Sequence, residues 1–138
     1  MDETRASLDE SSDRFKQVYA DIEAVVRGIF PTAERVVAYK MPGFKIRIGD
    51  EGVKSWRGTI DPNYLQLFLV ERKSGITLHL WNPRDYDGLE RRRAELSAVG
   101  FKVMRGCIQW NRKQAYPVET VRSLLESVKQ HLQEPREK

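Results

Sequence analysis

The chain has 138 residues, of which 40% are hydrophobic and 32% charged, and its formal net charge is +4. This length is near the common size of one domain and is sufficient for one hydrophobic core. No run approaches the roughly 18 to 20 apolar residues of a membrane span, and the acidic start lacks the apolar stretch of a secretory signal. Cys107 is the single cysteine, which is typical of a reducing compartment, so we expect a cytoplasmic protein.

Charge is unevenly spread along the chain. Residues 1–11 are charged and lack periodic apolar positions, so we predict an acidic disordered tail, followed by one domain over 12–133 and a polar tail at 134–138. Between Glu95 and Glu119 there is no acidic residue. The basic residues of that stretch are Lys102, Arg105, Arg112 and Lys113. They fit either an edge strand protected from aggregation or a surface for an anionic ligand such as RNA, and we expect at most weak RNA binding.

The first predicted element is a helix from Ser12 or Asp13 to about Phe30, with Pro31 ending it. Its apolar positions follow helical spacing and are Phe15, Val18, Tyr19, Ile22, Val25, Val26 and Ile29. A strand at 35–40, a sharp break at Met41-Pro42-Gly43 and a strand at 44–48 come next.

Two turns, at 49–52 and 61–63, flank a weaker strand at 53–60. Residues 65–72 and 76–81 then form the clearest hairpin, around 73–75.

The last third of the chain returns to helical spacing twice. Asp87 and Glu90 resemble a capping arrangement for a second helix that ends near Gly100. Residues 101–110 predict one final strand, bent around Gly106, and Pro117 is placed to start a C-terminal amphipathic helix. The alternating strands and the two amphipathic helices predict an α+β fold: a two-layer α/β sandwich with the helices on one face of an antiparallel sheet.

Two segments resemble those of a known family. The run Tyr39-Lys40-Met41-Pro42-Gly43-Phe44-Lys45 is similar to the Ser-Tyr-Gly-Met-Pro-Ala-Phe signature of the YdhG-like family, small bacterial and archaeal proteins of unknown function. The later run Arg105-Gly106-Cys107-Ile108-Gln109-Trp110, with Pro117 after it, resembles that family's Lys-Gly-Thr-Ile-Gln-Phe strand and Pro-led last helix. The resemblance covers roughly residues 12–133.

This resemblance implies a frataxin-like fold, and one bacterial member of the family is regarded as an iron chaperone for iron–sulfur and haem assembly. Iron is therefore a possible cargo by resemblance alone. A frataxin-type iron surface is a dense acidic ridge, because hard iron prefers carboxylate oxygens. Here Asp21 and Glu23 alternate with basic residues such as Arg27, so we expect weak iron binding or none.

Catalytic signatures are not apparent in the sequence. Cys107 and His79 lie on different predicted strands, and a buried structural cysteine is the commoner case, so we assign no catalytic and no metal-ligating residue. The run Arg91-Arg92-Arg93 spreads over about 200° of a helix, so these three side chains are not expected to form one patch.

The aromatic residues suggest a binding surface. On the strand 76–81 the even positions are apolar, which leaves Thr77, His79 and Trp81 on the other face. Lys45 and Arg47 of the earlier strand are expected on that face too. An open face of this kind could dock a protein or a small anionic molecule.

Alternatively, the break at 41–43 could shape a small cleft. The residues that would line it are Tyr39, Met41, Phe44 and Trp110. The sequence thus favours a small binding or adaptor domain that acts through its sheet face or this aromatic cleft. The alternatives are an iron chaperone and a weakly RNA-associated protein.

Overall fold

The computed structural model describes residues 12–38, 40–48, 64–73, 75–82 and 88–133. The elements in chain order are α2 (Asp13–Ile29), β1 (Glu34–Ala38), β2 (Met41–Arg47), β3 (Tyr64–Arg72), β4 (Gly75–Trp81), α3 (Gly88–Arg91), α4 (Arg93–Val99), β5 (Lys102–Met104), β6 (Cys107–Trp110) and α5 (Val118–Gln133). The predicted tails at 1–11 and 134–138, the strand at 53–60 and its flanking turns lie outside the described residues.

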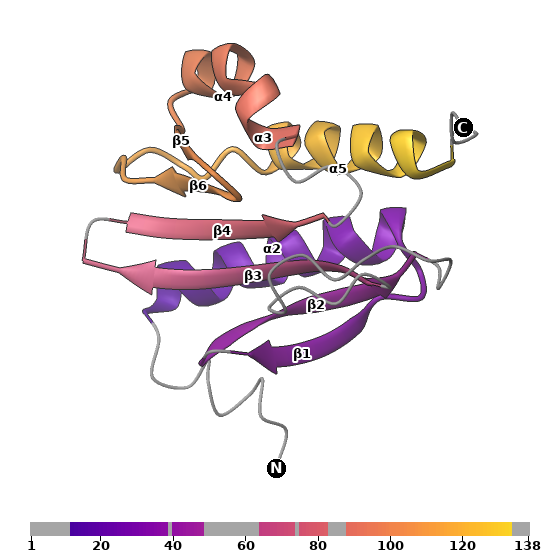
Figure 1. The fold of residues 1–138 in the computed structure, drawn as a ribbon. Coiled ribbons are helices and arrows are strands. Elements are labelled where there is room, and N and C mark those ends of the chain that lie inside the picture. Colours follow the sequence, from indigo (N-terminus) through magenta and orange to yellow (C-terminus); the bar gives the residue numbers. More distant parts are fainter. Residues whose placement is uncertain (1–11, 39, 49–63, 74, 83–87, 134–138) are drawn as a thin grey trace.

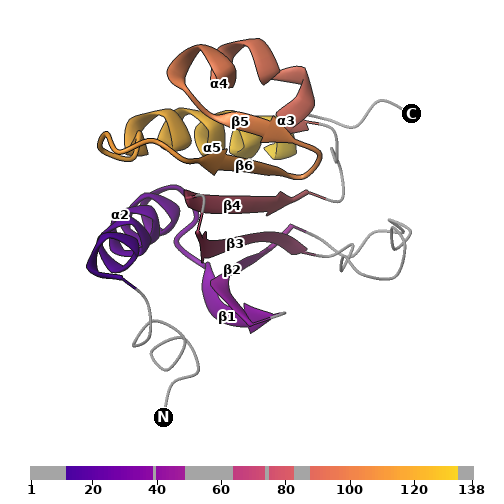
Figure 2. The ribbon, with the colours of Figure 1, turned by 90° about the vertical axis from the view of Figure 1, so that its left-hand side faces the viewer.

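The strands form one six-stranded sheet in the order β1-β2-β3-β4-β6-β5, and each neighbouring pair is antiparallel. The two long helices, α2 and α5, lie together on one face of this sheet (Figure 1, Figure 2). The predicted α+β two-layer sandwich is therefore confirmed. No helix within the described ranges is both long and apolar enough to cross a membrane.

The core lies between the sheet and the two long helices. Ile22 and Val26 of α2, and Val121 and Leu125 of α5, have no exposed surface, and Val128 packs against the same cluster while partly buried. The sheet contributes its alternate positions, which are Phe44, Ile46, Leu65, Leu67, Leu69, Ile76, Leu78, Leu80, Val103, Ile108 and Trp110. The predicted apolar stripes of the two helices are thus buried together.

The first helix begins where its cap is predicted. The Ser12 hydroxyl accepts a hydrogen bond from the backbone N–H of Phe15 at 3.1 Å, which satisfies one of the free N–H groups of the first turn. The same hydroxyl donates to Glu71 at the end of β3, and the Ser12 backbone N–H donates to that carboxylate at 3.1 Å. The start of α2 is therefore attached to the hairpin of β3 and β4.

The Met41-Pro42-Gly43 segment corrects the sequence interpretation, because it lies inside β2 and does not break the chain. The reversal comes earlier, at Lys40, whose φ of 63° lies in the left-handed region. Ala38 consequently pairs with Met41, and β2 continues in register along β1. Proline's fixed φ is compatible with an extended strand, so Pro42 need not end one.

The segment 101–110 is also different from its prediction, since it forms two short strands. The chain turns at Arg105 and Gly106, where Gly106 has a φ of 78°, and Met104 then pairs with Cys107. The glycine that predicted a bend in one strand is the turn of a hairpin. A φ in this range is accessible to glycine without a steric penalty.

The predicted helix that ends near Gly100 is divided into α3 and α4, with Arg92 between them. Its end is as expected, because Gly100 has a φ of 125° and its N–H reaches the carbonyls of the last turn. Both helices lie against the edge strand β5 (Figure 1), and the Arg93 guanidinium donates to the Val103 carbonyl at 2.9 Å. This packing covers one edge of the sheet, which would otherwise be a template for pairing.

Leu125 is the best test of this architecture, because it joins α5 to the shared core with no exposed surface. We expect Leu125→Ala to lower the free energy of unfolding by about 2–5 kcal/mol, measured by urea titration. Val99→Ala is the matched control, since Val99 is 41% exposed and its truncation should change stability by no more than about 0.5 kcal/mol. Equal losses in the two variants would contradict the described core.

Candidate binding face of the sheet

The second face of the sheet, opposite α2 and α5, carries a continuous row of residues across five strands. Gly43 pairs with Phe68, Phe68 with His79, and His79 with Cys107. Met104 of β5 pairs with Cys107 and ends the row. Because side chains alternate along a strand, all five positions share one face.

Aromatic packing fills the centre of this face. The Phe68 ring has no exposed surface and lies 5.0 Å, between ring centroids, from Trp81. His79 lies 6.0 Å from the Trp81 ring in an edge-on arrangement, and Trp81 itself is half-buried. The face is therefore apolar and packed at its centre, with a half-exposed indole at its margin.

Two buried polar atoms interrupt this apolar surface. The Thr77 hydroxyl oxygen and the Nε2 atom of His79 are buried, and neither has a hydrogen-bond partner among the described residues. Burial lowers the pKa of His79, and the positive charge of Arg72 lowers it further, so the neutral ring is favoured. A buried polar atom without a partner is costly, and groups of this kind mark places where a ligand can supply the missing bond.

Cys107 is close to His79 but is not prepared for nucleophilic chemistry. Burial raises the pKa of the Cys107 thiol, an effect that the charge of Arg72 only partly opposes. The thiol form is therefore favoured near neutral pH, whereas the thiolate is the nucleophile and the metal ligand. This surrounding fits a structural cysteine.

A basic margin lies beside the aromatic centre. The Lys45 ammonium is 4.8 Å from the centroid of the Tyr64 ring, and the Arg47 guanidinium carbon is 5.9 Å from it. Lys45 also approaches Glu34 at 3.9 Å, in a partly exposed ion pair. Cation–π contacts of this kind hold two positive charges at one end of the face, within reach of an anionic partner.

Two of the remaining predicted site residues lie on the opposite face of the sheet. Phe44 and Trp110 point to the helix side, where Phe44 stacks on Tyr19 at 5.4 Å and Trp110 packs edge-on against Phe101 at 5.2 Å. Trp110 is on β6, separated from β2 by two strands, so it lines no common cleft with Met41. Met41 is buried on β2 and shares the second face with Gly43 by alternation, and Tyr39 lies outside the described residues.

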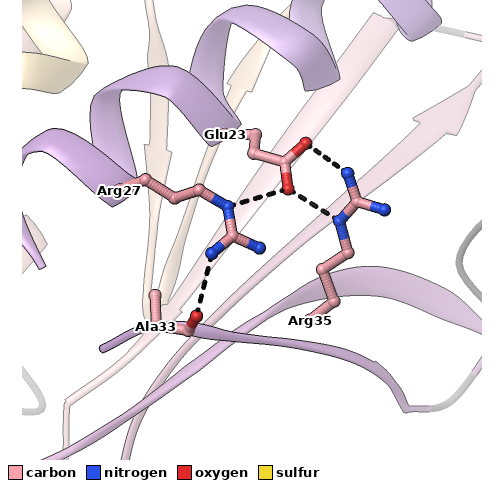
Figure 3. A network of polar contacts seen from close by, with 4 residues as sticks. All are labelled: Glu23, Arg27, Ala33 and Arg35. Carbon is pink, nitrogen blue, oxygen red and sulfur yellow. Dashed lines mark hydrogen bonds and ion pairs between the residues drawn. The ribbon is translucent and has the colours of Figure 1, made fainter. Parts of the chain in front are cut away.

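The acidic residues of α2 have structural partners. Glu23 accepts two hydrogen bonds from Arg35 at 2.7 Å and one from Arg27 at 3.2 Å (Figure 3). Arg27 also donates to the Ala33 carbonyl at 3.2 Å, so the network joins the end of α2 to β1. Asp21 accepts from Gln17 at 2.9 Å. The described residues contain no group of three or more side chains suited to hold a metal ion.

Sequence reasoning missed Phe68 on the second face, although a signal for it was present. Along β3 the odd positions Leu65, Leu67 and Leu69 form an apolar set that faces the helices. The even positions must then face the opposite side, which assigns Phe68 to the face that holds Trp81. Thr77 follows from the same alternation on β4, but its lack of a partner is visible only in the structure.

Comparisons with known proteins add no relative: no family model, no curated protein and no solved structure matches this chain.

Gly43 provides a test of the packing on this face. A Cβ atom there would lie 1.9 Å from the Leu67 carbonyl oxygen and 2.8 Å from the Phe68 ring, so Gly43→Ala should lower the free energy of unfolding by about 1–3 kcal/mol. Gly28→Ala is the control on α2, because the added Cβ meets nothing within 4 Å. This variant should raise the free energy of unfolding by about 0.5–1 kcal/mol. Chemical denaturation measures both, and a harmless Gly43→Ala would show that the strands are not this close.

Glu23 provides a test by pH. The contacts with Arg35, chiefly, and with Arg27 lower the pKa of the Glu23 carboxyl from its ordinary value of 4.5. The ionised carboxylate therefore contributes its full stabilisation above pH 4.5, and this contribution is lost as the pH falls through the lowered pKa. We expect Glu23→Gln to cost about 1 kcal/mol at pH 7, discounted for partial exposure, and progressively less in acid.

The matched control for Glu23 is Glu119→Gln, which removes an exposed pair with Arg122 at 3.0 Å. That change should cost less than about 0.5 kcal/mol at any pH. Urea titrations of both variants across acid and neutral pH make the comparison. A Glu23→Gln effect that stays constant into strong acid would show that the network does not depend on the ionised carboxylate.

Proposed function

We propose that this protein is a non-enzymatic binding domain that holds an acidic segment of a partner protein against the second face of its sheet. The observation that carries the proposal is the buried Nε2 atom of His79, which has no hydrogen-bond partner among the described residues and lies beside the half-buried Trp81. A partner that displaces the groups now covering Nε2 would supply that hydrogen bond and also cover the indole.

The composition of the face supports this proposal. Trp and Tyr are enriched among residues that dominate binding energy, because each offers a large rigid apolar surface with a polar end. Trp81 and Tyr64 are both half-buried, so part of each side chain is accessible. The indole would supply most of the affinity in its contact with an apolar residue of the partner.

The charges at the margin specify the partner as acidic. Lys45 and Arg47 lie over the Tyr64 ring, and Lys45 pairs at 3.9 Å with Glu34, whose side chain is 68% exposed. An exposed ion pair of this kind contributes little, so an incoming carboxylate could replace it. Complementary charge mainly raises the rate of association and selects against basic partners.

The two alternative functions have less support from contacts in the fold. The iron-chaperone proposal depends on the family resemblance, and of the α2 carboxylates that it would use, Glu23 already binds Arg27 and Arg35. The RNA proposal depends on the basic stretch, in which Arg112 donates to the Gly100 carbonyl at 3.3 Å. Both remain predictions, and binding to the second face is the function that the geometry favours.

The test is a titration of the isotopically labelled protein with short synthetic peptides, followed by NMR. Peptides that contain glutamate and one leucine or phenylalanine should shift the Trp81 indole and His79 signals, while peptides with lysine in place of glutamate should not. Trp81→Ala should weaken binding about tenfold or more, which corresponds to about 1–2 kcal/mol, with the fold preserved.

Charge variants separate the contributions. Arg47→Gln should slow association and reduce its dependence on salt, whereas Lys113→Gln, an exposed basic residue outside the face, should change neither. An affinity that does not depend on the peptide's charge, or that is unchanged in Trp81→Ala, would contradict the proposed site. A Trp81→Ala variant that unfolds would identify the indole as part of the core instead.

A further inference from the structure

A cavity of about 210 Å³ lies on the helix side of the sheet, where the end of β4 meets α3 and the second half of α5. Figure 1 shows α3 lying against α5 at this place. Leu80 contributes to the cavity and Trp81 to the second face, because adjacent strand residues point to opposite sides. The cavity is therefore a separate site from the proposed partner-binding face.

The cavity has an apolar interior and a basic, hydrogen-bonding rim. Its apolar residues are Leu80, Leu89, Leu124 and Val128, of which the three leucines are at most 5% exposed. Its polar residues are Asn82, Arg91, Arg92, Ser127 and His131. None of the described residues that line it is acidic. A ligand that matches this lining has a hydrocarbon body and a negatively charged end.

The break between α3 and α4 directs Arg92 toward the cavity. Arg92 has φ −98° and ψ 12°, outside regular helix geometry, and its guanidinium donates a hydrogen bond to the Ser127 hydroxyl on α5. The same guanidinium contacts Glu95 at 3.3 Å in an ion pair whose carboxylate is 58% exposed. A guanidinium has five N–H donors in a planar fork, more than these two contacts use, and the fork matches a carboxylate.

The three consecutive arginines have different positions, which assigns them different roles. Arg91 and Arg92 line the cavity, while Arg93 donates to the Val103 carbonyl and lies 3.8 Å from Glu90. The sequence expectation that the run forms no single patch is confirmed, although two of its members share one site. The polar cavity residues on α5, Ser127 and His131, are four residues apart and so lie on one face of that helix.

We propose that this cavity binds a small organic carboxylate, with its charged end between Arg91 and Arg92 near Ser127 and its hydrocarbon body against Leu80, Leu89 and Leu124. The volume limits the ligand, because 210 Å³ is below the roughly 300 Å³ at which pockets for drug-sized molecules begin. A molecule the size of phenylacetate or hexanoate is suitable. Two arginines and a hydroxyl supply more donors than a neutral amide end could satisfy.

The experiment titrates the protein, labelled at leucine and valine methyl groups, with phenylacetate and hexanoate, and separately with their neutral amides. We expect both carboxylates to shift the methyl signals of Leu80, Leu124 and Val128, and the amides to bind at least about tenfold more weakly. Inorganic phosphate is a further arm that tests whether the hydrocarbon body matters.

Variants assign the charge recognition to the cavity. Arg91→Gln should weaken carboxylate binding about tenfold or more, and Ser127→Ala should weaken it by a smaller factor. Arg122→Gln is the matched control, because Arg122 is on α5, pairs with Glu119 and does not line the cavity. It removes the same charge and should leave affinity unchanged. Arg92→Gln is a second charge variant, interpreted only if its NMR spectrum shows the native fold.

Several results would overturn the proposal. They are the lack of any methyl response to either carboxylate up to about 10 mM, an equal response to the amides, and full affinity in Arg91→Gln. Phosphate binding as tight as that of phenylacetate would show that the leucines contribute nothing, which also contradicts the assignment. None of these outcomes depends on the second face, because Trp81→Ala should leave carboxylate binding intact.

Discussion

The burial of one face of the sheet under α2 and α5 is the interaction on which the rest of this structure depends. Ile22 and Leu125 have no exposed surface and belong to one cluster with Leu78 at the centre of the sheet. Each long helix has a single apolar stripe, which is not stable when exposed to water, and the sheet provides the matching surface. Alternation along each strand then decides which side chains face this core and which face away from it.

The consequence for function is that alternation along each strand gives the sheet two different faces. Positions that face the helices are apolar, whereas the second face combines Phe68, His79 and Trp81 with a basic margin at Lys45. The core is already complete on the first side, so the polar atoms on the second side have no comparable role in packing. That difference is why the unsatisfied His79 Nε2 atom supports a binding role better than a structural one.

The end of β4 is where both proposed sites originate. Leu80 faces the cavity between α3 and α5, and Trp81 faces the opposite side of the sheet. The two sites are separated by the thickness of the sheet and share one strand end. The conformation of Arg92, between α3 and α4, contributes to the cavity alone.

The amino-acid sequence by itself determined the elements with strong periodicity. Helical spacing predicted α2 and α5 closely, because an apolar residue in every turn has few alternatives, and alternation predicted the β3–β4 hairpin. It also placed His79 and Trp81 on the face opposite Leu78, which the register confirms. The weakly periodic region at 53–60 lies outside the described residues, so its predicted strand stays a prediction.

Only the tertiary structure decided which residues meet across the chain. Glycine and proline indicate where the backbone conformation is free or restricted, but not where a strand begins. The reversal at Lys40 and the turn at Gly106 are therefore evident only in the structure. The structure does not bring the residues of the predicted aromatic cleft together, because Trp110 packs with Phe101 on the helix side. Strand order depends on long-range pairing that the local sequence does not encode. The cavity lined by Arg92 and Ser127 joins residues 35 positions apart, and such a contact exists only when the whole core has formed.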